Sequence, residues 1–249
     1  MRMRHAAAIA LVLLAAEGSS RPTFAEGAGK KVLVVTVTKG FRHDSIPTAE
    51  RVIGELARQS GAFTVAFART DAELAAAAAP QALQGLDAVL LANTTGDLPF
   101  PDPEALIQWV EGGRALIGFH SASDTFHGFR PFVETLGGEF DYHRQQAKII
   151  PRVDDPGHPA TRDWPNDLEL FDEIYLFKSF RPERVHLLLS LSRHPNSGEA
   201  GQYPLAWTRS AGRGRVFYTA LGHREDVLDA PWFRKHLLGG LLWALGLTP

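Results

Sequence analysis

Short apolar runs without polar alternation constrain the fold of this chain more than any other feature. They cover residues 31–37, 87–92 and 115–119, and the first is rich in valine. Such runs are typical of strands buried on both faces of a parallel sheet, since a strand with one wet face would alternate polar and apolar residues. Helical patterns lie between them, at about residues 47–57, 71–79 and 103–111, with a further strand at 63–67. The alternation predicts an α/β fold with a doubly wound, mostly parallel sheet.

The second half of the chain has a less regular pattern. A short helix is expected at residues 129–136 and a long last helix at 232–245, with strands at 147–153, 185–191, 205–209 and 215–220. No internal repeat or interdomain linker interrupts the pattern. We therefore expect one domain over residues 26–249, with a partly antiparallel second half.

The first 25 residues have the composition of a secretory signal peptide. Arg2, Arg4 and His5 form a basic start, and the apolar run over residues 6–16 is too short to span a bilayer. We expect cleavage after Ala25, a periplasmic or secreted protein, and no integral membrane span.

Composition excludes several kinds of chemistry. The chain has no cysteine, which rules out disulfides, zinc–thiolate sites and a cysteine nucleophile. Its net charge is −2 and becomes about −4 without the leader, and it has no basic tract. Nucleic acid is therefore not an expected partner.

The segment Gly118-Phe119-His120-Ser121-Ala122 has the shape of a nucleophile elbow, a sharp turn between a strand and a helix. The following residues, 123–125, are typical of a helix start. An imidazole at the elbow can bind a metal or carry a proton near neutral pH. Because adjacent residues on a sharp turn point apart, a relay between Ser121 and His120 is not expected.

Several other histidines follow predicted strands. Strand ends meet at one edge of an α/β sheet, so these side chains are expected to converge there. The predicted metal ligands are His43, His120, His143 and His223, and the predicted catalytic groups are His120, Glu173 and His43. Imidazole with a carboxylate suits zinc, manganese, nickel or iron. Acid–base chemistry by the histidines without a metal stays open as an alternative.

The other histidines carry weaker expectations. His127 is left open, His158 is expected in a turn, and no role is assigned to His186, His194 or His236, the last on a surface helix. Aromatic and polar residues near the candidate centre suit a sugar ligand. The predicted substrate-binding residues are Phe41, Arg42, Asp124, Tyr142 and Tyr175.

At these residues the chain resembles the ThuA-like family, named for trehalose utilisation. The matching stretches include residues 38–47, 118–125, 137–143, 172–175 and 204–223. The resemblance implies the flavodoxin-like sandwich of class I glutamine amidotransferases, with His120 in place of their elbow cysteine, and hence no amidotransferase activity. In the family the elbow is commonly followed by a Trp-rich helix, and residues 125–129 contain no tryptophan.

The resemblance further implies carbohydrate catabolism of trehalose, a related disaccharide or a 3-keto derivative. The favoured hypothesis is an enzyme that cleaves or isomerises such a keto-glycoside. The alternative is a non-catalytic periplasmic sugar-binding or partner protein. The apolar last helix could also serve a homo-oligomer.

Overall fold

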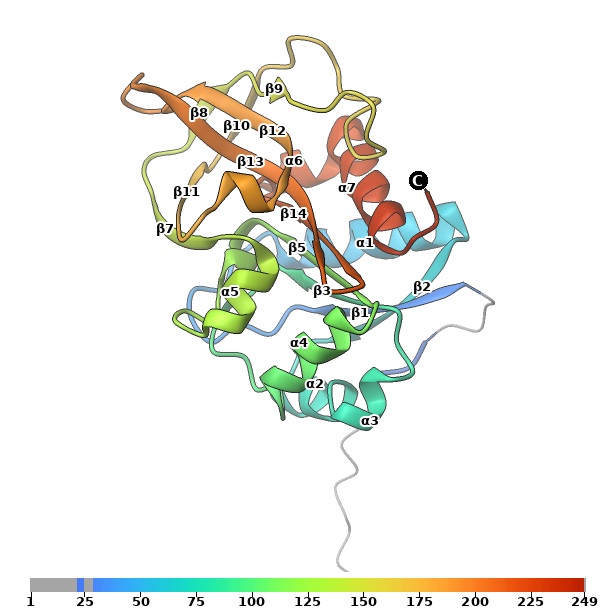
Figure 1. Cartoon of the computed structure of the whole chain (residues 1–249). Coiled ribbons are helices and arrows are strands. Elements are labelled where there is room, and N and C mark those ends of the chain that lie inside the picture. The colour runs from blue at the N-terminus through green and yellow to red at the C-terminus, as the bar shows by residue number, and fades with distance from the viewer. Residues whose placement is uncertain (1–21, 25–28, 249) are drawn as a thin grey trace, which may run out of the picture.

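The computed structural model describes residues 22–24 and 29–248 of the chain (Figure 1). The expected signal peptide lies outside the described residues except for positions 22–24, and so does its cleavage site. Within the described part, no helix has the length and apolar character needed to cross a bilayer.

An eight-stranded sheet forms the centre of the molecule, in the order β2-β1-β3-β5-β14-β13-β12-β9. Its first five strands are parallel: β2 (Phe63–Ala68), β1 (Lys30–Val35), β3 (Ala88–Ala92), β5 (Ala115–Phe119) and β14 (Gly214–Thr219). The last three pair antiparallel: β13 (Ala200–Ala211), β12 (His186–Arg193) and β9 (Arg152–Val153). The predicted mixed sheet, parallel in its first half, is confirmed.

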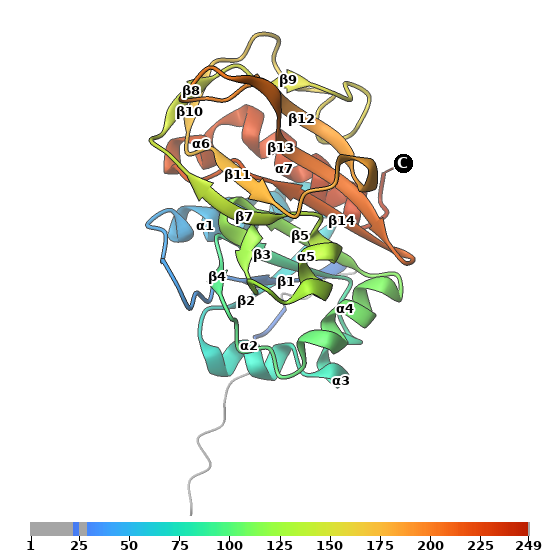
Figure 2. The ribbon, with the colours of Figure 1, turned by 60° about the vertical axis from the view of Figure 1, so that its left-hand side comes forward.

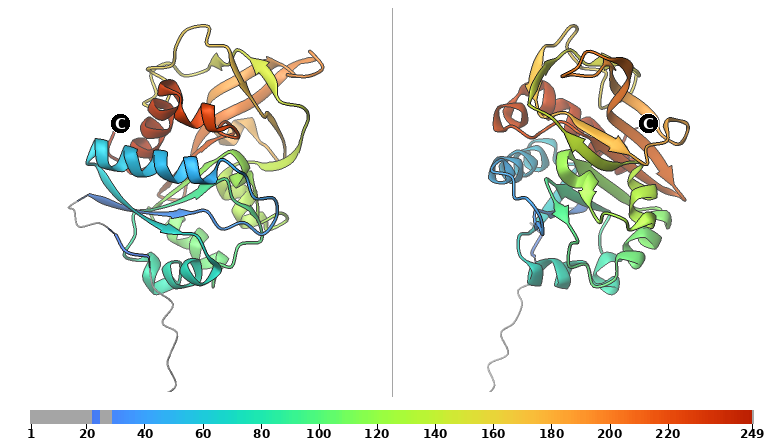
Figure 3. Two further views of the ribbon diagram at one scale, coloured as in Figure 1. Left: turned by 180° about the vertical axis from the view of Figure 1, so that it is seen from behind. Right: turned by 90° about the vertical axis from the view of Figure 1, so that its left-hand side faces the viewer.

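Helices cover both faces of this sheet and complete a three-layer sandwich (Figures 1 and 3). One face carries α1 (Ile46–Ser60), α6 (Glu225–Asp229) and α7 (Pro231–Ala244). The other carries α2 (Asp71–Ala77), α3 (Pro80–Leu83), α4 (Pro103–Glu111) and α5 (Arg130–Leu136). Because the sheet lies between two apolar clusters, every residue of β3 and β5 is buried, as the continuous apolar runs predicted.

The run at residues 147–153 was expected as one strand and forms two. β8 (Ala147–Ile149) pairs with β10 (Leu170–Asp172), whereas β9 joins the central sheet. Pro151 lies at the break and has no N–H to continue the pairing. A two-stranded ribbon that the sequence pattern did not predict, β7 (Glu139–His143) with β11 (Tyr175–Lys178), lies beside this region (Figure 2).

The chain after the elbow also differs from expectation. Residues His120–Ser123 form a single 3₁₀ turn, and Asp124–Thr125 then forms a short strand, β6, paired with β4 (Thr95–Gly96). The Asp124 carboxylate binds the His127 ring instead of capping a helix. The helix expected directly after the elbow is therefore delayed until α5 begins at Arg130.

The last helix is not the surface helix that was expected at His236. A Cβ added at Gly239 would lie 2.0 Å from the Pro159 carbonyl oxygen, so this face of α7 lies directly on its neighbours. His236 is consequently 1% exposed, and its Nδ1–H donates to the carbonyl of Ala160 at 2.8 Å.

Candidate metal centre

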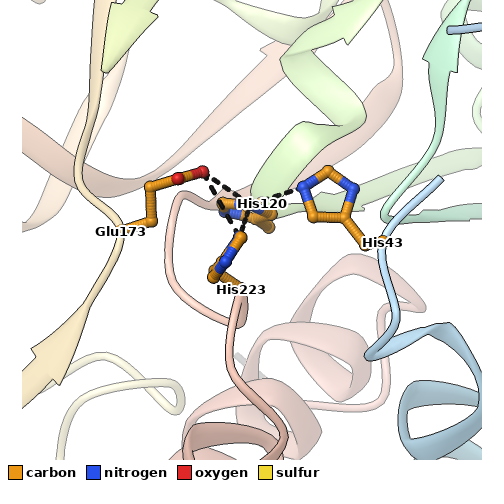
Figure 4. Close-up of side chains that lie close together, drawn as sticks. All are labelled: His43, His120, Glu173 and His223. Carbon is orange, nitrogen blue, oxygen red and sulfur yellow. Dashed lines mark hydrogen bonds and ion pairs between the residues drawn. The ribbon is translucent and has the colours of Figure 1, made fainter. Parts of the chain in front are cut away.

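Four side chains from distant parts of the chain meet above the carboxyl ends of the parallel strands (Figure 4). His43 follows β1, His120 follows β5 directly, and His223 follows β14. Glu173 lies between β10 and β11 and completes the group from the opposite side. The strand-end histidines converge because parallel strands deliver their carboxyl ends to a single edge.

The spacing of the four inward-facing atoms suits one metal ion. His120 Nε2 lies 3.1 Å from His43 Nε2, 3.1 Å from His223 Nδ1 and 3.5 Å from Glu173 Oε2, and the last two atoms are 3.3 Å apart. All four lie within 4.8 Å of one another. Ligands of a tetrahedral ion held at about 2.1 Å lie about 3.4 Å apart. The residues therefore fit a four-coordinate divalent cation with three imidazoles and one carboxylate.

His120 is held in a strained conformation that turns its ring toward the group. Its φ is +47°, in the left-handed region that non-glycine residues seldom adopt. The Tyr218 hydroxyl donates to the His120 carbonyl at 2.6 Å and fixes the turn. The Ala220 carbonyl lies 3.1 Å from His120 Nδ1 and can only accept, so Nδ1 carries the proton and Nε2 offers a lone pair.

His43 is kept neutral by its surroundings. Burial lowers its pKa to about 3, assisted by the neighbouring rings of His120 and His223. Its Nδ1 lies 3.3 Å from Ser121 Oγ, which leaves Nε2 free to face the group. Ser121 thus serves His43 rather than His120, in line with the expectation that adjacent elbow residues point apart.

Glu173 supplies the negative charge of the group. Burial opposes its ionisation, but the imidazoles of His120 and His223 beside it hold the pKa of this carboxyl well below its usual range. Burial lowers the pKa of His223, and the Glu173 carboxylate more than reverses that effect and raises it. A proton on His223 Nδ1 and a metal cation would therefore compete for the same position, because both are drawn by Glu173.

Two buried polar residues that are not among the predicted site residues hold the centre in place. Asp172 accepts the backbone N–H of Gly222 at 2.8 Å and that of Glu173 at 3.0 Å, which ties the loops of two ligands together. Asn93 has a φ of +51°, and its Nδ2 donates to Ser45 Oγ at 2.9 Å. Asn93 was recognisable as a polar residue at the end of an apolar strand, but its partners were not.

His143 lies outside the four-atom group. Its Nδ1 is 3.1 Å from Glu173 Oε1, the carboxylate oxygen that does not face the other histidines. The imidazole side chain is 42% exposed and stacks on Tyr175 with ring centres 5.8 Å apart. His143 thus stands between the buried group and solvent.

Two of the five predicted substrate-binding residues have exposed aromatic rings, and the other three contact groups within the protein. Phe41 is 67% exposed with its ring 4.9 Å from that of His43, and Tyr142 is also exposed. Arg42 donates to the Thr36 carbonyl at 3.1 Å, and Asp124 binds His127. Tyr175 is buried with its ring 4.4 Å from that of His120, where it supports the imidazole.

A cavity of about 430 Å³ opens beside the centre. Its lining includes Phe41, His43, Ser45, His223 and Arg224, so two of the three converging histidines are reached from it. The opening is large enough for a sugar-sized ligand.

Comparisons with known proteins agree with this architecture. A family model described as "ThuA: Trehalose utilisation" matches residues 31–244. A ThuA-like protein of Bacteroides uniformis matches with a TM-score of 0.71 and 21% identity, over 89% of this chain and 94% of that one. A ThuA-like protein of Parabacteroides merdae gives 0.70 and 19%, over 88% and 91%. No curated protein sequence matches the chain.

A β-galactosidase of Rahnella sp. R3 matches with a TM-score of 0.54 and 13% identity, over 89% of this chain and 32% of that enzyme. At such identities the structural likenesses concern the fold alone. They agree with the predicted sandwich and carry no information about the chemistry of the site.

Proposed function

The chain belongs to the ThuA family of trehalose utilisation, which gives it a role in carbohydrate metabolism, and from this premise we propose that it is a metal-dependent enzyme acting on a keto-glycoside. One observation carries the proposal. Three imidazole nitrogens and one carboxylate oxygen converge with the spacing of metal ligands, at the edge of the sheet where α/β proteins bind their substrates.

The donor set favours a particular class of ion. His43, His120 and His223 would supply nitrogen, and Glu173 would supply oxygen. Imidazole with a carboxylate suits zinc, manganese, nickel or iron better than magnesium or calcium, which prefer oxygen. When bound, such an ion supplies Lewis acidity toward a carbonyl oxygen or a water molecule.

His143 is the proposed proton carrier. Its Nδ1 is engaged by Glu173 Oε1 and by the carbonyl of Arg144 at 2.9 Å, which leaves Nε2 as the free nitrogen of an exposed ring. Imidazole is the side chain that most often moves protons near neutral pH. Glu173 would orient the ring and balance the positive charge that forms when His143 takes up a proton.

The proposed reaction is an elimination that needs no oxidant. His143 removes the proton from the carbon between the keto carbon and the glycosidic carbon. The electron pair of that C–H bond forms a carbon–carbon double bond, and the bond to the glycosidic oxygen breaks. The departing oxygen takes a proton from the protonated His143 or from water, and later addition of water to the double bond gives the free keto-sugar.

Exposed aromatic rings would hold the sugar next to these groups. Phe41 presents an accessible face beside the centre, where the cavity of about 430 Å³ extends from it to Arg224, and Tyr142 is exposed on β7. The same faces favour a second candidate function, a sugar-binding protein without chemistry. That alternative predicts saturable sugar binding with neither a metal nor turnover.

Metal content tests the proposal first. The chain from residue 26 onward, purified without a His-tag or chelator, is expected to hold about one equivalent of a single divalent metal by mass spectrometry. His120→Ala should lose it, while His186→Gln, an exposed histidine paired with Asp155, should retain it. The metal-loaded protein should then release monosaccharide from a 3-keto disaccharide. Undiminished turnover by His120→Ala would reject the metal-dependent mechanism, and sugar binding without turnover would favour the second candidate.

A further inference from the structure

A second cavity, of about 330 Å³, opens beside α5, away from the four converging side chains. Four arginines from three elements line it. Arg130 begins α5, Arg181 precedes and Arg184 ends the short 3₁₀ turn Pro182–Arg184, and Arg209 belongs to β13. Nothing in the proposed reaction uses these guanidinium groups.

Acidic groups offset only part of this charge. Arg130 pairs with Glu134 at 2.6 Å, and Arg209 donates to the backbone carbonyl of Glu134. Among the described residues, no carboxylate lies within ion-pair distance of Arg181, Arg184 or Arg209. Burial lowers the pKa of Arg209, and the like charge of Arg184 lowers it further, as expected where positive charge is in excess.

The second acid of the cavity, Glu139, is already engaged. His127 Nδ1 lies 2.9 Å from its Oε1, the backbone N–H of Gly128 donates to the same atom at 3.2 Å, and Lys178 lies 3.7 Å away. Glu139 therefore has its own cations and does not neutralise the arginines. Glu134 acts on all four arginines and offsets one of their charges, so the cavity keeps an excess of positive charge.

The cavity is separate from the histidine group, although one ribbon borders both. In the β7–β11 ribbon, Glu139 pairs with Lys178 at the arginine end, and His143 pairs with Tyr175 at the histidine end. The four residue-to-residue steps from Glu139 to His143 span about 13 Å of extended strand. A monosaccharide at the histidine group would not reach the arginines, so the cavity would bind a ligand of its own.

We propose that this cavity is a binding site for a small oxyanion, the phosphate or carboxylate group of a metabolite. Guanidinium groups bind such anions through paired N–H donors, in a geometry that lysine cannot reproduce. Arg181 and Arg184 are exposed and would close on the anion. The half-buried Arg209 is held in place because its guanidinium donates to the backbone carbonyls of Ser210 and Glu134. A volume of about 330 Å³ accommodates the anion with a small organic group attached.

Calorimetric titration with inorganic phosphate tests the site, at constant ionic strength and on metal-free His120→Ala protein so that phosphate cannot bind a metal. Saturable 1:1 binding is expected, and each of Arg181→Gln and Arg184→Gln should weaken it about tenfold, the value of one charge-assisted hydrogen bond. Arg58→Gln removes the same charge from the exposed end of α1, on the opposite face of the sheet, and should leave the phosphate affinity unchanged. Parallel titration with citrate distinguishes a phosphate site from a carboxylate site.

Two results would overturn the proposal. One is the absence of saturable binding of both anions. The other is equal weakening by Arg58→Gln and Arg184→Gln, which would indicate a general effect of net charge. Since the titration uses protein without its proposed metal, failure of the anion site and failure of the metal site are observed independently. Circular dichroism of each variant confirms that loss of binding is not loss of fold.

Discussion

The carbonyl oxygen of Ala220 lies 3.1 Å from Nδ1 of His120, one hundred residues away in sequence. This contact determines which nitrogen of His120 faces the other histidines. A carbonyl only accepts, so it fixes the proton on Nδ1 and leaves the lone pair of Nε2 directed at His43, His223 and Glu173. The adjacent strands β5 and β14 supply the two partners.

Replacing His120 by asparagine should remove the central ligand of the proposed metal site. Its Nε2 is the atom nearest to all three other ligand atoms. Affinity for zinc or manganese is expected to fall more than about 100-fold, beyond the 10- to 100-fold typical of residues that only orient ligands. Competition with a chromogenic chelator measures the change, and His186→Gln is the matched control. Equal affinity of both variants would contradict the ligand assignment.

Asp172→Asn tests the residue that ties two ligand loops together. Its two oxygens accept the backbone N–H groups of Gly222 and Glu173, and an amide would direct its own N–H₂ at one of them. We expect a loss of about 2 kcal/mol in the free energy of unfolding, and metal affinity about 10- to 100-fold lower. Urea denaturation and metal titration measure the two effects. The exposed Asp163→Asn should alter neither, and an unchanged metal affinity in Asp172→Asn would show that the loops hold their positions without it.

Gly118→Ala should disturb the elbow through a steric clash that a second substitution can relieve. An added Cβ would lie 2.8 Å from the Cβ of Ala122 and 3.3 Å from the Tyr218 ring. Such overpacking costs about 1–3 kcal/mol of folding free energy. The double variant Gly118→Ala/Ala122→Gly removes the closer contact, so it should be more stable than Gly118→Ala despite the added glycine. Thermal denaturation measures the stability of both variants. A double variant less stable than the single one would show that the contact with Ala122 is not the source of the strain.

Acid should destabilise the metal-free protein through His236. Burial lowers the pKa of its imidazole to about 4, whereas the unfolded chain binds the proton near 6.5. The contribution of neutral His236 to the free energy of unfolding is therefore fully present above pH 6.5. It falls as pH decreases toward 4, because only the unfolded state takes up the proton in that range. Between pH 7 and 4.5 the loss attributable to this group is roughly 2 kcal/mol.

His236→Leu isolates this contribution. The variant lacks the hydrogen bond to Ala160 and is expected to be less stable at pH 7, but its stability should depend less steeply on pH. Urea midpoints at pH 7 and 4.5, measured with chelator present, give the slope for each protein. Identical slopes would show that His236 does not titrate as its burial requires. His43, whose pKa burial also lowers, leaves a residual slope in the variant.

Local patterns were sufficient for the first half of the fold. Ala115–Phe119 and Pro103–Glu111 have the bounds that their apolar patterns predicted. In the second half, pairing between distant segments overrides local pattern. The β7–β11 ribbon joins residues about 35 positions apart, and no run of residues marks either strand before they pair.

The sequence by itself determined the parallel strands, the apolar layers, and which histidines follow strand ends. These features follow from local composition, and the carboxyl ends of parallel strands share an edge whatever the loops do. Only the tertiary structure decided that Glu173 closes the group while His143 stands outside it, and that four arginines share one cavity. These arrangements depend on side-chain directions and on contacts between loops, such as the hydrogen bond from the Gly222 N–H to the Asp172 carboxylate. Such contacts leave no periodic pattern in the sequence.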